Sequence, residues 1–212
     1  MPRNVRPQGY AEQEAAGKIP IRPHRGAPDH VKIGTDRAVG FVNFSTVAAP
    51  RGVVLNGKKA WYEITFTSGD GVSQIGWGTS DFSTSVRYSG DGDSDDDSDG
   101  VGDCTDSWGF DGQRVCKWFD GNHHSWGKKF EATGGRVLGV AADMVEGKIL
   151  FGLDGDWGKP MGVAFDNLST ELGLFPALSA EGMKVKVNFG EDEMKFGPPD
   201  ESYEKLNDIV GK

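Results

Sequence analysis

Apolar and polar residues alternate along this chain in short runs separated by glycine, asparagine and aspartate. In residues 61–67, the period of two places Tyr62, Ile64 and Phe66 on one face, and residues 183–189 repeat the pattern. This alternation is typical of strands in a sheet with one face toward water. The runs predict strands at residues 31–33, 39–44, 52–55, 61–67, 72–78, 107–110, 114–119, 137–143, 149–153 and 183–189.

Two-residue turn signals connect several of these runs and favour tight hairpins. They are Asn56-Gly57, Asp111-Gly112, Asp120-Gly121 and Asp154-Gly155. Many short strands joined by such turns predict an all-β fold of the β-sandwich type over residues 31–195. The spacing of the runs leaves no room for the helices that an α/β enzyme needs between its strands.

The two flanks have a different composition from the predicted domain. Residues 1–30 hold several prolines with scattered arginine and glutamate, which predicts an extended N-terminal tail. Residues 196–212 predict a polar C-terminal tail that could form a short helix. Neither a secretion signal nor a run of about 18 apolar residues is found, so we expect an intracellular protein without a membrane span.

The net charge of −9 comes almost entirely from one acidic segment. Nine aspartates and no basic residues lie between Arg87 and Arg114, so the rest of the chain is close to neutral. Such a charge balance would repel a nucleic-acid backbone and excludes nucleic acid as the expected partner. The acidic residues are Asp91, Asp93, Asp95, Asp96, Asp97, Asp99, Asp103, Asp106 and Asp111.

Few residues suggest catalysis or a structural metal. Cys104 and Cys116 are too few for a zinc site, and the sequence leaves open whether they pair. Glu63 and Asp143 lie inside predicted strands, where a structural role is expected rather than acid–base chemistry. The adjacent His123-His124 are predicted in a solvated turn. Core packing is expected for the aromatic residues Trp77, Trp108, Trp118, Phe119 and Phe151.

Six phrases of the sequence resemble the SPRY domain family in their order and approximate spacing. They are GKKAWYEITF, SQIGWGTSDF, SWGFDGQRVCKWFDG, RVLGVAADMVEGKILFGLDG, LFPALS and VKVNFG, within residues 31–195. No Leu-Asp-Pro tripeptide occurs in residues 1–50, so the resemblance is to the form without a PRY segment. It implies a bent, concanavalin-like sandwich of two antiparallel sheets that is not an enzyme.

The resemblance further implies binding of a peptide or protein surface through variable loops at one end of the sandwich. The loops that match this face are residues 68–72, 83–102 and 180–183. Within them, the candidate binding residues are Asp70, Arg87, Tyr88 and Glu181. The alternative is that these are ordinary solvated loop residues.

The acidic insert at residues 90–106 is outside the family pattern. Carboxylates at alternate positions around Gly100 match the spacing of a calcium loop, although the last ligand would be aspartate instead of glutamate. The candidate ligands are Asp95, Asp97, Asp99, the Val101 carbonyl, Asp103 and Asp106. A solvated flexible insert and an insert docked on a basic partner remain open as alternatives.

The sequence therefore predicts a non-catalytic interaction module, or a structural subunit of a larger complex, with a protein or peptide partner. The acidic insert would favour a basic partner. The alternative is a calcium- or glycan-binding, lectin-like sandwich that uses the aspartate-rich loop. No cofactor other than calcium is implied.

Overall fold

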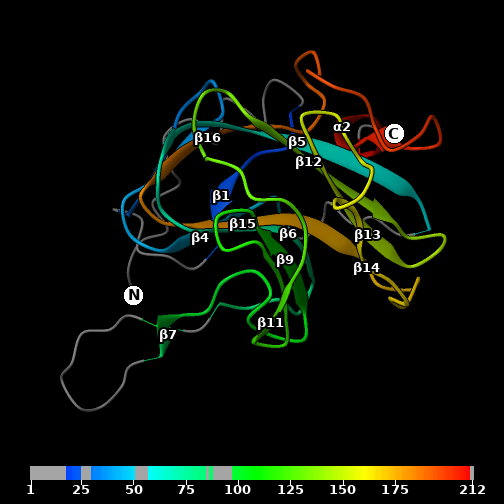
Figure 1. Ribbon diagram of the computed structural model, residues 1–212, viewed down its shortest axis with the longest axis horizontal. Coiled ribbons are helices and arrows are strands. Elements are labelled where there is room, and N and C mark those ends of the chain that lie inside the picture. Colours follow the sequence, from blue (N-terminus) through cyan, green and yellow to red (C-terminus); the bar gives the residue numbers. More distant parts are fainter. Residues whose placement is uncertain (1–17, 25–29, 51–56, 85, 88–96, 211–212) are drawn as a thin grey trace.

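The computed structural model describes residues 18–24, 30–50, 57–84, 86–87 and 97–210, and its fold is a β-sandwich of two antiparallel sheets (Figure 1). The first sheet has the strand order β1 (Arg22–Pro23), β4 (Ser45–Ala48), β15 (Leu174–Ala180), β6 (Ser73–Thr79), β9 (Ser107–Asp111), β10 (Cys116–Phe119) and β11 (Asn122–Ser125). The predicted all-β sandwich is confirmed.

The second sheet packs against the first. Its order is β14 (Gly162–Phe165), β13 (Lys148–Leu153), β12 (Val137–Asp143), β5 (Lys59–Gly69), β16 (Met183–Asn188), β3 (Ala38–Phe41) and β2 (Val31–Ile33). The short β17 (Glu204–Lys205) lies parallel to the start of β5 and leads into the helix α2 (Leu206–Val210). A separate pair, β7 (Val86–Arg87) and β8 (Asp97–Ser98), forms the base of the acidic hairpin.

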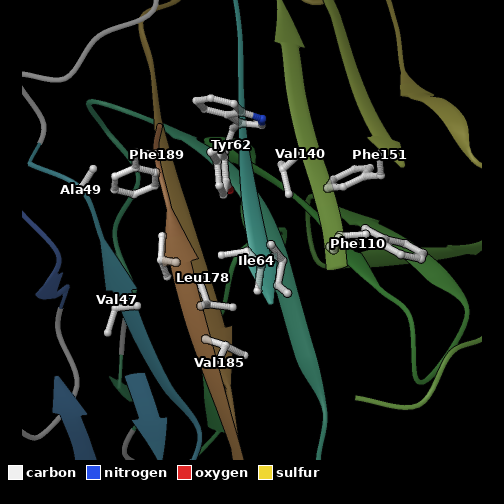
Figure 2. Packing of buried hydrophobic residues seen from close by; sticks show 14 of the residues in the cluster. Val47, Ala49, Tyr62, Ile64, Phe110, Val140, Phe151, Leu178, Val185 and Phe189 are labelled. Carbon is white, nitrogen blue, oxygen red and sulfur yellow. The ribbon is translucent and has the colours of Figure 1, made fainter. Parts of the chain in front are cut away.

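The core lies between the sheets (Figure 2). It is filled by the apolar side chains that the period of two predicts on one face of each strand. Tyr62, Ile64 and Phe66 of β5 are all buried there, as are Val185 and Val187 of β16. The hydroxyl of Tyr62 donates a hydrogen bond of 2.7 Å to the Gly76 carbonyl of the facing sheet. The predicted inner faces of β5 and β16 are therefore confirmed. Alternate side chains of a strand point to the same face, and here those side chains are buried in the core.

The structure contains two central strands that the sequence pattern did not predict. Residues 45–48 and 174–180 are buried on both faces, so they lack the alternation that marks a half-exposed strand. The second of them also contains Pro176, a residue that usually argues against a central strand. Its carbonyl accepts a hydrogen bond of 3.1 Å from the Ala49 N–H.

The prediction of a turn at His123-His124 is wrong. Asp120 and Gly121 form the complete turn, with φ of 54° and 68°, so the next strand begins at Asn122. The two histidines lie within β11 at the exposed edge of the first sheet. The predicted strand at 52–55 lies outside the described residues.

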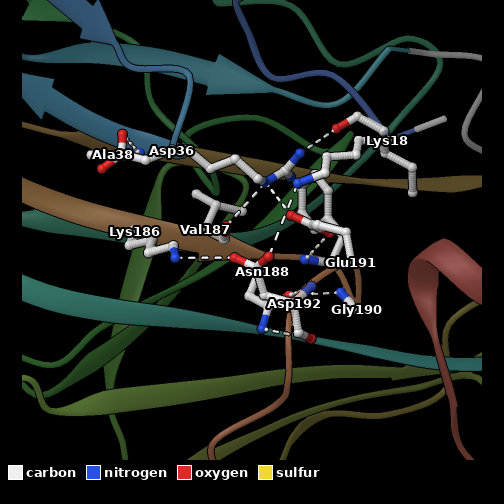
Figure 3. A network of polar contacts seen from close by, with 12 residues as sticks. Lys18, Asp36, Ala38, Lys186, Val187, Asn188, Gly190, Glu191 and Asp192 are labelled. Carbon is white, nitrogen blue, oxygen red and sulfur yellow. Dashed lines mark hydrogen bonds and ion pairs between the residues drawn. The ribbon is translucent and has the colours of Figure 1, made fainter. Parts of the chain in front are cut away.

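The packed body extends beyond residues 31–195 at both ends. Ile19 and Ile21 belong to the core, and the strand that follows them pairs with β4. Leu206 and Ile209 of α2 are also buried against the core. These apolar side chains are spaced among polar residues, which is why composition indicated tails. Figure 3 shows Lys18 beside the end of β16, where it pairs with Asp192. The Ile19 carbonyl accepts a hydrogen bond from the Arg37 side chain.

No helix in the described part of the chain has the length and apolar character needed to span a membrane. Cys104 and Cys116, whose pairing the sequence left open, are both free thiols.

Candidate protein-interaction site

Two of the three loops predicted from the sequence lie side by side at one end of the sandwich. The turn between β5 and β6 and the turn between β15 and β16 meet there, because β5 pairs with β16 and β6 pairs with β15. Gly69 is opposite Met183 in one pairing, and Ser73 is opposite Ala180 in the other. The two turns therefore continue the two sheets at the same end.

The backbones of these turns interlock without intervening side chains. The Glu181 N–H donates a hydrogen bond of 3.1 Å to the Val72 carbonyl. A Cβ atom on Gly71 would lie 1.9 Å from the Glu181 carbonyl oxygen, so only glycine fits at this position. Asp70 and Glu181 are both exposed on this tightly joined backbone, as a binding surface requires.

A third turn, between β9 and β10, joins the same end. The Ser73 hydroxyl donates a hydrogen bond of 2.9 Å to the side-chain carbonyl of Gln113. The Asp111 carboxylate shapes this turn by accepting the N–H groups of Gln113 and Arg114, each at 2.8 Å. Gln113 could not be predicted from the sequence, since its only signal there is an ordinary Asp-Gly turn. We call residues 69–72, 111–115 and 181–182 the loop end.

The acidic hairpin is the third predicted loop. Its strands β7 and β8 project away from both sheets (Figure 1), and Val86 and Arg87 pair with Ser98 and Asp97. The side chain of Arg87 is not described and Tyr88 lies outside the described residues. Their membership of the binding surface therefore stays a prediction.

The C-terminal part of the acidic insert packs on the outer face of the first sheet. Val101 is fully buried in a small apolar cluster with Phe82 and Phe175, and its N–H donates to the Ser179 hydroxyl at 3.0 Å. The sequence pattern predicted that residues 90–106 form one surface insert. The structure shows that apolar contacts of Val101 anchor part of this insert. The chain that follows the projecting hairpin is therefore fixed to the first sheet at Val101.

The calcium hypothesis rests on oxygens that are only partly described. Asp95 lies outside the described residues, and the side chain of Asp97 is not described. The Asp103 carboxylate accepts hydrogen bonds from the Gly100 N–H at 2.7 Å and the Gln74 amide at 2.9 Å. Among the described residues, no three His, Cys, Asp or Glu side chains are grouped as a metal site. The calcium loop stays a prediction.

Most of the aromatic residues are core residues, as expected. Trp77, Trp108 and Phe151 are buried. Phe119, which was expected in the core, is instead 36% exposed and stacks on Trp108 with ring centroids 5.4 Å apart. Trp118 is half-buried, with the Arg114 guanidinium 4.5 Å from its ring. Both Phe119 and Trp118 belong to β10. This strand is next to the edge strand β11, at the margin of the first sheet, where side chains are less covered.

The two carboxylates inside strands hold backbone segments. Glu63 accepts the N–H groups of Lys195 and Phe196, at 2.9 and 2.8 Å. Burial raises the pKa of Glu63, although these two hydrogen bonds oppose the shift. Asp143 accepts the N–H groups of Val145 and Glu146 in the hairpin between β12 and β13. Both carboxylates thus have the structural contacts that their positions predicted.

Asp143 gives a prediction for acid stability. Burial would raise the pKa of its carboxyl, but the 2.8 Å ion pair with Lys59 and the two N–H donors outweigh burial, and the net pKa is lowered. The stabilisation by the carboxylate is therefore present above an ordinary aspartate pKa of about 3.9 and is lost as the pH falls through the lower folded-state value. Asp143→Asn should cost about 1–2 kcal/mol of unfolding free energy at neutral pH.

Urea unfolding between neutral pH and pH ~3 would measure this difference. The stability of the wild type should approach that of the Asp143→Asn variant below about pH 4. Stability curves that stay parallel throughout the acid range would contradict the assigned role of Asp143.

The fold is a β scaffold that presents three closely packed turns at one end. The family model described as SPRY domain matches residues 59–192, and the chain belongs to the SPRY domain family. This match begins with β5 and includes every turn of the loop end. SPRY domains are generally non-catalytic modules for protein–protein interaction.

A curated relative carries a similar segment. The E3 ubiquitin-protein ligase RKP of Arabidopsis thaliana is 30% identical over 156 residues, which cover 71% of this chain and 11% of the relative. The chain thus spans only about a ninth of that protein.

Proposed function

We propose that this SPRY domain binds a peptide or protein surface through the loop end. The observation that carries the proposal is the interlocking of the turns at Gly71 and Glu181, which presents two exposed carboxylates from closely packed backbone. A surface that needs little ordering on binding loses less conformational entropy. The site binds its partner without chemical change to it.

The preferred partner in this proposal is basic. Asp70 and Glu181 add negative charge to the loop end, and the acidic insert extends from the same domain. Complementary charge accelerates encounter and discriminates against acidic competitors. The proposal includes a place as an intracellular interaction subunit of a larger complex.

The proposal predicts the effect of reversing both charges at the loop end. Peptides selected from a displayed random library on the full chain should be rich in lysine and arginine. The variant Asp70→Lys/Glu181→Lys should bind them about ten-fold or more weakly at low salt, because it replaces attraction with repulsion. Fluorescence anisotropy of the labelled peptides would measure the change.

Glu171→Lys is the matched control, since Glu171 is exposed on the connection between β14 and β15, near the opposite end of β15. It should leave the affinity within about two-fold of the wild type. Equal effects of the control and the double variant, or selection of peptides without basic residues, would contradict binding through the loop end.

Calcium or glycan binding by the aspartate-rich loop is the alternative that the sequence left open. No observation on the described residues favours it over peptide binding. It is therefore not part of the proposed function.

A further inference from the structure

The edge strand β11 has a backbone that is open to pairing. It is the last strand of the first sheet, and all four of its residues are exposed. In the described part of the chain, no strand lies on its outer side. Proteins commonly protect such edges with proline, lysine, bulges or covering loops, because unpaired N–H and C=O groups recruit other strands. Asn122–Ser125 contains neither proline nor lysine and pairs in unbroken register with β10.

The tight turn before β11 determines which backbone groups face outward. Asp120 and Gly121 both have positive φ, as the two-residue type I′ hairpin requires. The flanking residues Phe119 and Asn122 are opposite each other, and in such a hairpin they form the first hydrogen-bonded pair.

Hydrogen-bonded pairs alternate with non-hydrogen-bonded pairs along an antiparallel ladder. His124 therefore uses its N–H and C=O groups toward β10, and those of His123 and Ser125 point to the open side. The hydrogen bond of 3.0 Å from the Trp126 N–H to the Val115 carbonyl continues the same alternation. His123 and Ser125 therefore each present one N–H donor and one C=O acceptor at the open edge. Their separation of two residues is the repeat of an antiparallel ladder.

Basic side chains follow directly after this edge. Lys128 and Lys129 are exposed between two aromatic anchors, Trp126 and Phe130. The ring centroid of Trp126 lies 5.2 Å from that of Phe110, and the ring centroid of Phe130 lies 5.0 Å from that of Phe66. The two lysines therefore extend from a short segment whose ends are attached to the core.

The same segment lines a surface hollow with a third basic group. Lys128, Lys129 and Arg136 border the hollow together with the single acid Glu131. Arg136 is held by an ion pair of 2.8 Å with Asp154, whereas neither lysine forms an ion pair within the described residues. This part of the surface is positive although the whole chain carries a net charge of −9.

We propose that β11 accepts an extended, acidic peptide of a partner protein as an additional strand. The main chain of the peptide would pair with the outward groups of His123 and Ser125, and its carboxylates would lie at Lys128 and Lys129. Strand addition to an open edge derives affinity from main-chain hydrogen bonds and selectivity from side chains. This site adjoins the loop end at Val115 but uses different side chains, and it has the opposite charge preference.

Two variants of the full-length chain test the two parts of this site separately. Ser125→Pro removes an outward N–H but no bond of the ladder to β10, so the fold should tolerate it. Lys128→Glu/Lys129→Glu reverses the neighbouring charge. A labelled synthetic peptide of alternating threonine and glutamate is the probe, and the same peptide with glutamine in place of glutamate is its uncharged counterpart.

The wild type should bind the acidic probe in preference to the uncharged one. Ser125→Pro should weaken that binding about ten-fold, because the main-chain pairing is lost. The double lysine variant should weaken it to a similar extent at low salt, with a smaller difference at about 1 M salt. Lys58→Glu is the matched charge control, since Lys58 is exposed immediately before β5 of the second sheet, whereas β11 is the edge of the first sheet, and it should bind like the wild type.

A melting temperature of Ser125→Pro close to that of the wild type would establish that its fold is intact. Undiminished binding by such a folded variant would overturn strand addition, and equal binding of the charged and uncharged peptides would overturn the acidic preference. A dimer that forms without peptide and is abolished by Ser125→Pro would also overturn the proposal, since a second copy would then occupy the edge. Variants at Asp70 and Glu181 should leave this binding unchanged, so the two sites can fail independently.

Discussion

Replacing Arg37 with leucine is expected to lower the free energy of unfolding by about 3–5 kcal/mol, because it leaves a buried carboxylate without its counter-charge. The side chains of Arg37 and its ion-pair partner Glu191 are only 1% and 3% exposed. Glu191 lies within a network of polar contacts at the end of β16 (Figure 3). The guanidinium also lies 4.7 Å from the centre of the Phe189 ring.

Arg37 also connects distant parts of the chain. Its side chain donates hydrogen bonds to the Ile19 carbonyl at 2.7 Å and the Val187 carbonyl at 3.1 Å. The N-terminal segment before β1 is thereby held to the end of β16. In Arg37→Leu, trypsin should cleave after Lys18 sooner than in the wild type, because this segment would detach more often.

The double variant Arg37→Leu/Glu191→Leu is the informative control. It removes both charges, so it should recover part of the stability lost in the single variant. Urea unfolding, followed by tryptophan fluorescence, gives all the free energies that are needed. A loss below about 1 kcal/mol in Arg37→Leu would show that the ion pair contributes little, as exposed pairs do.

Glu63→Ala is expected to cost about 2–4 kcal/mol, because it leaves the N–H groups of Lys195 and Phe196 without their acceptors. Glu63 lies on the outer face of the second sheet and is 2% exposed. Glu63 therefore anchors the chain that follows β16, and Trp157 supports this by donating to the Gly197 carbonyl at 3.0 Å. Release of this segment should expose Trp157.

Hydrogen exchange at the amides of residues 194–197 would follow that release. Glu63→Gln retains one carbonyl acceptor, so its loss of stability should be about half as large. Glu171→Ala changes an exposed glutamate elsewhere and should have almost no effect. Unaltered exchange at residues 194–197 in Glu63→Ala would rule out the anchoring role.

Part of the candidate site could be predicted from the sequence and part could not. The family phrases placed Asp70 and Glu181 in loops, and the structure brings both loops together at the loop end. Gln113 was missed, because its contact with Ser73 joins residues 40 positions apart. The β11 edge was not predicted, because the sequence pattern assigns His123 and His124 to the turn at Asp120-Gly121. In the structure that turn ends at Gly121.

By itself, the sequence determined the half-exposed strands, the hairpin turns and the family. These depend on alternating apolar residues and on Asp-Gly pairs, which act over a few neighbouring positions. Only the tertiary structure decided that β4 and β15 are central strands, that Arg37 is buried with Glu191, and that Ile19, Ile21 and α2 pack against the core. Each of these depends on partners far away in the chain, and local patterns carry no record of which distant residue will satisfy a buried charge or cover an apolar face.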